Sequence, residues 1–264
     1  MPNWEDLATT DFAGFDPRRT VAVLPVAAVE QHGPHLPLGT DAILGDAVLA
    51  RALALLPPTP PVLRLPTQRV GHSPEHGSFA GTLSLRPETV LALWTEIGRS
   101  VAAAGLRTLV LLNSHGGQGG LVDTAAQALR CEAGLRVVRC SWYRFGIPEG
   151  WIDARERRFG LHGGQVETSL MLHVAPHLVR PAAVRDFRSA AEDWEAAIPG
   201  LEVEGESGIA WRAEDLNPAG ATGDAAAASP ELGARLLEHY AARLAAVIAA
   251  ARDLPQPPDQ QARV

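Results

Sequence analysis

Cysteine is scarce in this chain, which has only Cys131 and Cys140 among its 264 residues. Two cysteines cannot supply the disulfide framework of a small secreted domain, so we expect both to be reduced residues of the core. No run of about eighteen apolar residues occurs, so no segment is expected to cross a membrane. Residues 1–12, MPNWEDLATTDF, lack the basic and apolar stretches of a signal peptide. These absences predict a soluble, cytoplasmic protein.

Basic residues are outnumbered, because 23 Lys and Arg stand against 30 Asp and Glu, for a net charge of -7. Nucleic acids and anionic membranes attract clustered positive charge, so neither is expected as a partner. Hydrophobic residues make up 46% of the chain, which is enough for a sizeable core. No change of composition marks a linker, so we expect one domain over residues 1–252. The tail 253–264, DLPQPPDQQARV, is expected to be disordered.

Strand-like and helix-like segments alternate along the chain. Short apolar runs predict strands, and longer segments with apolar residues at helical spacing predict helices. This alternation is typical of an α/β fold, in which helices cover both faces of a mostly parallel sheet. Residues 180–228 lack the pattern and are expected to form irregular surface structure. The expected strands are 20–27, 61–70, 107–113 and 135–143, and the expected helices are 41–56, 86–105, 119–134, 165–176 and 229–252.

Polar residues that can bind ions follow two of the expected strands. Glu30 and His32 come after the first strand, and Asp41 stands at the start of the next helix. His115 lies just past the strand 107–113. Ligands of open α/β sheets gather at the carboxyl ends of the strands, so we expect these side chains to meet at one rim.

Carboxylate and imidazole groups without sulfur are ligands that suit Zn, Mn, Fe or Ni. A carboxylate can bridge two ions, and two ions roughly 3.5–4 Å apart can polarise a carbonyl and hold a hydroxide. Plainer interpretations exist, since Asp41 could be only a helix N-cap and any one histidine only a hydrogen-bonded loop residue. A purely structural role suits Glu30 less well, because burying an unpaired carboxylate costs free energy of folding. Together the residues favour a metal site.

Four segments, in this order, resemble those of the creatininase (creatinine amidohydrolase) family. They are LPVAAVEQHGPHLPLGTD, GHSPEHGSFAGTLSL, LVLLNSHGGQGG and HGGQVETSLML, and they cover roughly residues 20–175. The resemblance implies a three-layer α/β/α fold, a two-metal centre and a hexamer. It also implies hydrolysis of amide C–N bonds, often in cyclic or formyl amides.

The resemblance also implies a set of metal ligands. By position, Glu30, Asp41 and His115 resemble the ligands of one ion, and His32 and Asp41 resemble those of a second. Asp41 would then bridge two divalent ions, with Zn, Mn and Fe as the expected metals.

One ligand of creatininase has no counterpart at its usual position. Creatininase uses a glutamate two residues after the histidine that matches His115, and this chain has Gly117 there. We expect Glu167, at the start of the helix 165–176, to complete the second ion site. A glutamate in a first helical turn is also favoured by the helix dipole alone, so a structural role stays open.

Further residues are expected to act on the substrate. His162 matches a family histidine near the substrate, which implies that it donates to the oxyanion or protonates the leaving nitrogen. Glu167 or Glu75 is expected to carry the proton. Asn113 is expected either to orient His115 or only to cap its loop. The residues expected to bind the substrate are Ser73, His76, Gly116 and Gly117, although the loop with Ser73, Glu75 and His76 could equally be a structural turn.

These expectations combine into a metal-dependent amidohydrolase that uses a hydroxide held by two ions on a small amide substrate. Creatinine is not the expected substrate, because Gly116 replaces a tyrosine and Arg158 and Phe159 stand where a Trp-Asp pair would be. Relatives that act on formamide bonds of pyrimidine intermediates, or on a peptide precursor of a redox cofactor, suggest other substrates.

Two other classes of function are open. A metal-dependent phosphoesterase is disfavoured because the sequence has no basic phosphate cradle. A scaffold protein that only keeps the fold, with or without a metal, is disfavoured because Glu30, His32, Asp41 and His115 are all present.

Overall fold

A parallel sheet lies at the centre of the protein. The computed structural model describes residues 1–200, 202–205 and 207–255. In this part of the chain the sheet has the strand order β2-β1-β3-β4, and each neighbouring pair is parallel. The strands are β1 (Val21–Val26), β2 (Val62–Arg64), β3 (Thr108–Asn113) and β4 (Arg136–Ser141).

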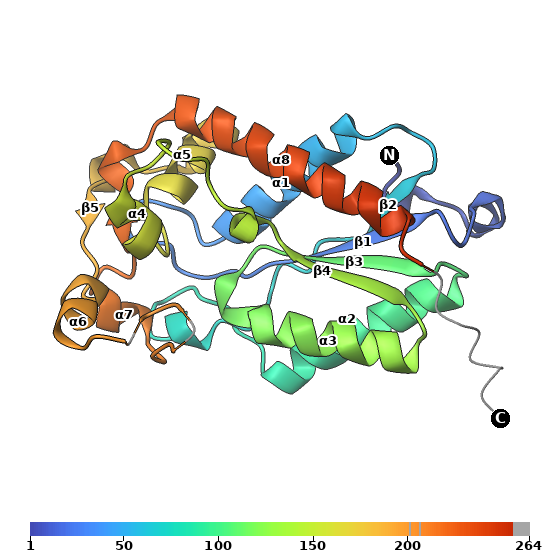
Figure 1. The fold of residues 1–264 in the computed structure, drawn as a ribbon, viewed down its shortest axis with the longest axis horizontal. Helices are drawn as coiled ribbons and strands as arrows, with labels where there is room; N and C mark the ends of the chain where they lie inside the picture. Colours follow the sequence, from blue (N-terminus) through green and yellow to red (C-terminus); the bar gives the residue numbers. More distant parts are fainter. Residues whose placement is uncertain (201, 206, 256–264) are drawn as a thin grey trace.

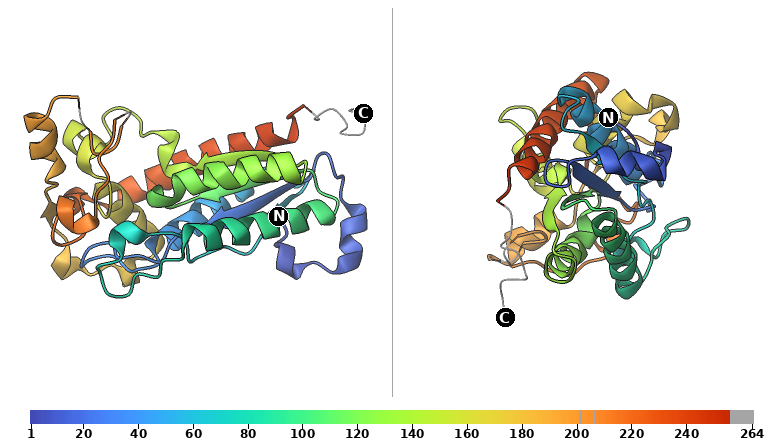
Figure 2. Two further views of the ribbon diagram at one scale, coloured as in Figure 1. Left: turned by 90° about the horizontal axis from the view of Figure 1, so that it is seen from below. Right: turned by 90° about the vertical axis from the view of Figure 1, so that its right-hand side faces the viewer.

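Helices cover both faces of this sheet, as Figures 1 and 2 show. Successive side chains of a strand point to opposite faces. Val21 and Val23 accordingly pack with α1, α5 and α8, whereas Ala22 and Leu24 pack with α2 and α3. The predicted three-layer α/β/α fold is therefore confirmed. The helices are α1 (Thr40–Leu55), α2 (Pro87–Ala103), α3 (Gly119–Glu132), α5 (Gln165–Val174) and α8 (Pro230–Arg252).

These helices begin and end within two residues of the predicted bounds, but one strand is much shorter than predicted. The strand expected over 61–70 ends at Arg64. Pro66 has no N–H group to continue the hydrogen-bond ladder. Beyond it only an isolated bridge joins Gln68 to Val26.

Residues 180–228 contain more structure than predicted. They form α6 (Ala191–Ala197), α7 (Ala213–Leu216) and an antiparallel pair of β5 (Asp186–Phe187) with β6 (Gly223–Asp224). These elements lie beyond the carboxyl ends of the central strands, at the left of Figure 1. The elements are short and several of their buried residues are alanines, so they carry no periodicity that would have predicted them.

Helices α5 and α8 pack closely because of a glycine. A Cβ atom at Gly233 of α8 would lie 2.0 Å from the carbonyl oxygen of Ser169 in α5. Ser229 caps α8, since its hydroxyl accepts a hydrogen bond from the N–H of Leu232 at 3.1 Å. The close approach of α5 to α8 therefore depends on the contact between Gly233 and the carbonyl of Ser169.

The structure bears on three further expectations from the sequence. Cys140 is buried as expected, but Cys131 is exposed, so the prediction that it belongs to the core is wrong. Among the described residues no helix is long and apolar enough to span a membrane. Helix α8 ends at Arg252 as predicted, and residues 256–264 of the expected disordered tail lie outside the described residues. A single domain over 1–252 stays a prediction.

Candidate metal centre

The polar residues expected at the rim of the sheet lie together beyond the carboxyl ends of β1 and β3. Glu30 and His32 belong to the loop after β1, Asp41 is the second residue of α1, and His115 is the second residue after β3. None of the four is more than 3% exposed. They meet because neighbouring parallel strands end at the same edge of a sheet.

Four groups of three side chains lie close enough together to hold an ion. Glu30 belongs to one group with His32 and His162 and to another with Glu75 and His76. The remaining two groups share Asp41. In the first of these two, His115 Nδ1 lies 3.2 Å from Glu30 Oε1 and 3.5 Å from Asp41 Oδ2. In the second group, His32 Nε2 lies 3.1 Å from Asp41 Oδ1 and 3.9 Å from Glu167 Oε1. The two oxygens of Asp41 therefore face different groups, as in a carboxylate that bridges two ions.

Backbone carbonyls orient both imidazoles. His32 Nδ1 donates to the carbonyl oxygen of Glu30 at 3.1 Å, which turns Nε2 toward Asp41. His115 Nε2 donates to the carbonyl oxygen of His72 at 3.0 Å, which turns Nδ1 toward the carboxylates. Metal-binding histidines are commonly held by such a second hydrogen bond. Each ring therefore directs one nitrogen into the cluster of carboxylates.

Negative charge accumulates around Asp41. Burial and the neighbouring Glu30 carboxylate raise the pKa of Asp41. Burial alone would lower the pKa of His32, but Asp41 and Glu167 raise it to about 10. Asp41 Oδ2 is buried and has no hydrogen-bond partner among the described residues. A buried oxygen without a donor, in a cluster of carboxylates and imidazoles, fits divalent metal ions, which would compensate the charge.

His162 is the middle of three stacked imidazoles beside this cluster. Its ring centre lies 4.1 Å from that of His32 and 4.2 Å from that of His76. His162 Nε2 donates to the carbonyl oxygen of Gln31 at 2.6 Å, and Nδ1 lies 3.8 Å from Glu30 Oε1. Burial and the positive charge of His32 lower the pKa of His162 to about 3. The Nε2–H is held by Gln31, so the ring turns the lone pair of Nδ1 toward Glu30.

Three residues of the loop after β2, which we expect to face the substrate, contact the candidate ligands. The hydroxyl of Ser73 donates to Glu30 Oε2, and His76 Nε2 lies 3.6 Å from Glu30 Oε1. Glu75 Oε1 lies 3.1 Å from His115 Nε2. Ser73 and His76 are buried, and Glu75 is only 14% exposed. The loop therefore forms a wall of the metal centre.

Glu167 is held in place by the loop that precedes α5. Its Oε2 atom accepts a hydrogen bond from the N–H of Gly163 at 2.6 Å. The buried carboxylate of Glu156, in α4 (Ala154–Phe159), accepts hydrogen bonds of 2.7 Å from the N–H groups of Gln165 and Asp224. Glu156 thus joins the start of α5 to β6. The hydrogen bonds of Gly163 to Glu167 and of Gln165 to Glu156 therefore hold the first turn of α5 and fix the position of Glu167.

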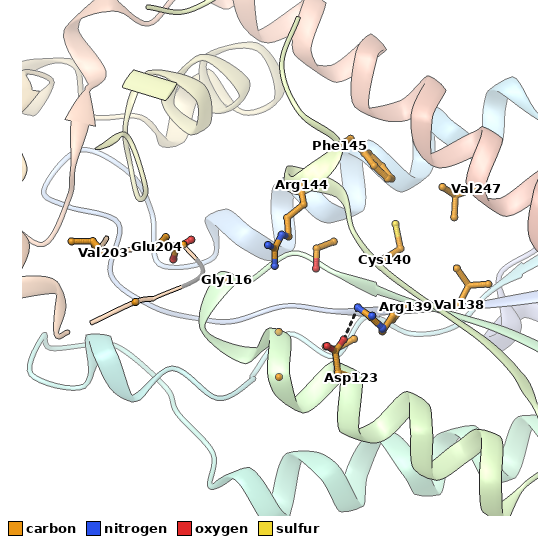
Figure 3. Close-up of a pocket in the computed structure, with 16 residues that line it drawn as sticks. Gly116, Asp123, Val138, Arg139, Cys140, Arg144, Phe145, Val203, Glu204 and Val247 are labelled. Carbon is orange, nitrogen blue, oxygen red and sulfur yellow. Dashed lines mark ion pairs between the residues drawn. The ribbon is translucent and has the colours of Figure 1, made fainter. Parts of the chain in front are cut away.

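A cavity of about 840 Å³ lies along α3 and β4, and Gly116 is the one residue of the expected site among those that line it. Gly116 lines it from the loop after β3, and Figure 3 shows Asp123 and Arg139 as an ion pair on its wall, with N and O atoms 2.9 Å apart. Gly116 and Gly117 are exposed, so a ligand can approach their backbone closely. The volume lies within the range of pockets that bind small molecules, about 300–1,000 Å³.

Asn113 shapes the loop that carries His115. Its Nδ2 atom donates to the carbonyl oxygen of His115 at 2.7 Å, and its Oδ1 atom accepts from the N–H of His115 at 3.1 Å. Both contacts involve the backbone and not the imidazole ring. Asn113 therefore caps the loop, which was one of the two roles expected from the sequence.

Gln31 contributes to the site although the sequence analysis overlooked it. Its side-chain amide donates to His76 Nδ1 and to the carbonyl oxygen of Gly220, both at 2.7 Å. Its backbone carbonyl accepts the hydrogen bond from His162. The signal that could have identified Gln31 is its place between Glu30 and His32.

The comparison with known families agrees with this geometry. The family model described as "Creatininase: Creatinine amidohydrolase" matches residues 5–248. This chain belongs to the creatininase family. The family membership predicted from the four segments is thus confirmed.

Curated members of the creatininase family resemble part of the chain. "Mycofactocin precursor peptide peptidase" of Mycobacterium tuberculosis (strain CDC 1551 / Oshkosh) is 38% identical over 164 residues, 60% of each chain. Its namesake from Mycolicibacterium smegmatis is 32% identical over 158 residues, 59% of this chain and 58% of the relative. "Creatinine amidohydrolase" of Pseudomonas putida is 33% identical over 180 residues, 60% of this chain and 66% of the relative. The aligned part thus spans about three fifths of the mycobacterial relatives.

Solved structures of the creatininase family share the whole fold. A putative creatinine amidohydrolase from Bacteroides fragilis has a TM-score of 0.78 at 21% identity, with 97% of this chain and 98% of that chain covered. A manganese form of creatininase has a TM-score of 0.73 at 27% identity, covering 97% and 99%. A Zn–Zn form of a creatininase variant has a TM-score of 0.75 at 28% identity, covering 97% and 98%.

Arg158, which replaces an expected tryptophan of creatininase, is engaged elsewhere in this family member. Its Nε atom lies 2.5 Å from Glu195 Oε2, and its terminal nitrogen lies 3.1 Å from Glu202 Oε1. The guanidinium is about half exposed. Arg158 therefore joins surface carboxylates of its own chain, and nothing in these contacts gives it a role at the metal centre.

Proposed function

We propose that this protein is a two-metal hydrolase that cleaves an amide C–N bond in a substrate other than creatinine. The observation that carries the proposal is the position of Asp41 between two groups of ligands, with one oxygen toward each. Its Oδ2 atom is buried without a hydrogen-bond partner among the described residues, and a bound cation would supply that partner.

Each proposed ion has three protein ligands. Glu30, Asp41 and His115 would hold one ion, and His32, Asp41 and Glu167 would hold the other. Nitrogen and oxygen ligands without sulfur suit Zn, Mn or Fe. Divalent ions at such a site polarise a carbonyl group and lower the pKa of water. The assignment of Glu167 is supported by its distance from His32 and by the absence of a side chain at Gly117.

His162 is proposed as the residue that moves the proton. Its Nε2–H is held by the carbonyl of Gln31, so the neutral ring presents the lone pair of Nδ1 to the cluster. We therefore assign it to accept a proton from the attacking water and to deliver that proton to the leaving nitrogen. This order differs from the expectation that His162 starts as a donor to the oxyanion.

A peptide-like substrate is supported better than creatinine. The relatives that are 38% and 32% identical are named as peptidases of a precursor peptide. The cavity that Gly116 lines has a volume of about 840 Å³, and Gly116 does not narrow it with a side chain. We propose that the substrate is a short peptide or another extended amide that reaches the metal centre across Gly116 and Gly117.

Metal analysis tests the site first. The full chain, incubated with Zn or Mn and then freed of excess ions, should contain about two ions per chain by mass spectrometry. Asp41→Ala should lose both ions, because Asp41 belongs to both groups of ligands. A wild-type chain that takes up no ion would refute the proposal and favour a scaffold.

Substrate screening then tests the reaction. The metal-loaded chain is incubated with short peptides, formamides, cyclic amides, creatinine and phosphate esters. Hydrolysis of a peptide or another amide, lost in Asp41→Ala, supports the proposal. Hydrolysis of phosphate esters alone would show that the protein is a phosphoesterase and would refute it.

Assembly and location stay predictions from the sequence. We propose a homo-oligomer, with the hexamer implied by the family resemblance, and a cytoplasmic location. Sedimentation of the metal-loaded protein would test the first, because a hexamer has six times the mass of the 28.0 kDa chain. Fractionation of the source cells would test the second.

A further inference from the structure

The side chain of Glu75 lies directly against the backbone of Gly117. A Cβ atom at Gly117 would lie 1.8 Å from Glu75 Oε1 and 2.8 Å from His115 Nε2. At the adjacent Gly116, a Cβ atom would meet no heavy atom within 4 Å. Gly117 does not have a positive φ, so the requirement is for space and not for a special backbone conformation. The Glu75 carboxylate occupies the place where a side chain at 117 would begin.

The carboxylate reaches His115 on the ring edge that faces away from the proposed ion. His115 Nδ1 faces Glu30 and Asp41, whereas Nε2 lies 3.1 Å from Glu75 Oε1 and 3.0 Å from the carbonyl oxygen of His72. Glu75 therefore contacts the nitrogen that carries the ring proton.

We propose that Glu75 is a positioning residue that holds His115 for metal binding, and that Gly117 is required because it leaves room for the Glu75 carboxylate. The inference rests on the proposed function only in taking His115 as a metal ligand. It assigns Glu75 a role other than the proton transfer expected from the sequence.

The loop that carries Glu75 is built to hold this position. Glu75 lies in a short 3-10 helix, Pro74–His76, whose first residue is a proline with a restricted φ angle. The N–H of Ser73 donates to the hydroxyl of Ser84 at 2.9 Å, and the hydroxyl of Ser73 donates to Glu30. Ser73, two residues before Glu75, is thus held by its backbone and by its side chain.

The chemical consequence is a stronger and better oriented ligand. A carboxylate that accepts the N–H of a metal-bound histidine fixes the ring and increases the basicity of the other nitrogen, and its loss typically weakens metal binding 10–100-fold. In this structure the Glu75 carboxylate shares the Nε2 edge of His115 with the His72 carbonyl, at 3.1 Å and 3.0 Å from Nε2.

The test measures metal affinity in the full chain with Zn and a competing chromophoric chelator. Glu75→Ala should weaken binding of one of the two ions about 10–100-fold and leave the other ion unaffected. Glu75→Gln keeps an acceptor oxygen and should restore part of the loss. Gly117→Ala should resemble Glu75→Ala, because it displaces the carboxylate, whereas Gly116→Ala should keep wild-type metal affinity.

A spectroscopic readout separates positioning from a general loss of structure. In the cobalt-substituted protein, the ligand-field bands should shift in Glu75→Ala and partly return in Glu75→Gln, while the metal-free variants unfold at the wild-type temperature. Wild-type affinity and cobalt spectrum in Glu75→Ala would overturn the proposal. An equal loss in Glu75→Ala, Glu75→Gln and Gly116→Ala would overturn it as well. Failure of the wild-type protein to hydrolyse any amide would refute the proposed function and leave this result untouched.

Discussion

Gly233→Ala should destabilise the protein although it improves the helix propensity of α8. The added Cβ would lie 2.0 Å from the carbonyl oxygen of Ser169, whereas ordinary contact begins at 3.4 Å. Helices α5 and α8 would have to separate by about 1.4 Å, because a backbone carbonyl cannot rotate away as a side chain can. Overpacking of this kind costs about 1–3 kcal/mol, and Ala in place of Gly returns about 1 kcal/mol of helix propensity.

Taking the upper figure for a clash with backbone, the net loss is about 2 kcal/mol. At a urea m value of about 3 kcal/mol/M, the unfolding midpoint should fall by roughly 0.7 M. The assay is urea unfolding of the metal-free chain followed by circular dichroism. The matched control is Gly120→Ala in α3, where the added Cβ meets no atom within 4 Å and stability should rise by less than about 1 kcal/mol. Equal stabilisation of both variants would refute the reasoning from close packing.

Three further predictions concern the metal centre and the thiols. Glu167→Gln should reduce the metal content from about two ions per chain to about one by mass spectrometry, and unchanged content would show that Glu167 is not a ligand. His162→Ala should lower kcat about 10²–10⁴-fold on any amide substrate found, with full metal content; loss of an ion would instead make His162 a ligand. Burial raises the pKa of Cys140 to about 12, so at pH 8 only the exposed Cys131 should react with a thiol reagent in the native protein, and both should react in urea. Rapid labelling of both thiols in the native chain would contradict this.

The sequence predicted the sheet and its covering helices because their signals are local. The strand over residues 21–26 is a continuous apolar run, which is typical of a strand buried on both faces. The helix 230–252 has a serine cap, an early proline and regular apolar spacing. Glu30, His32 and Asp41 could be grouped with His115 because a parallel sheet brings the loops after β1 and β3 to one edge.

The orientations of several side chains at the site could not be predicted, because they depend on contacts between residues far apart in the sequence. The orientation of His162 is set by the carbonyl of Gln31, 131 residues away in the sequence. Ser73 and Glu75 have side chains that suit substrate binding, yet their nearest partners are Glu30 and His115 from other loops. Hydrogen-bond partners of this kind follow from the three-dimensional arrangement and not from residue spacing.

The two adjacent glycines after His115 differ in what they allow a protein engineer to do. A larger residue at position 117 would displace the Glu75 carboxylate from His115. Position 116 borders the cavity with free space around it, so a side chain placed there would extend into the cavity without displacing atoms of the chain. Randomising residue 116 alone would therefore vary the size and polarity of this cavity, while the proposed metal ligands keep their places.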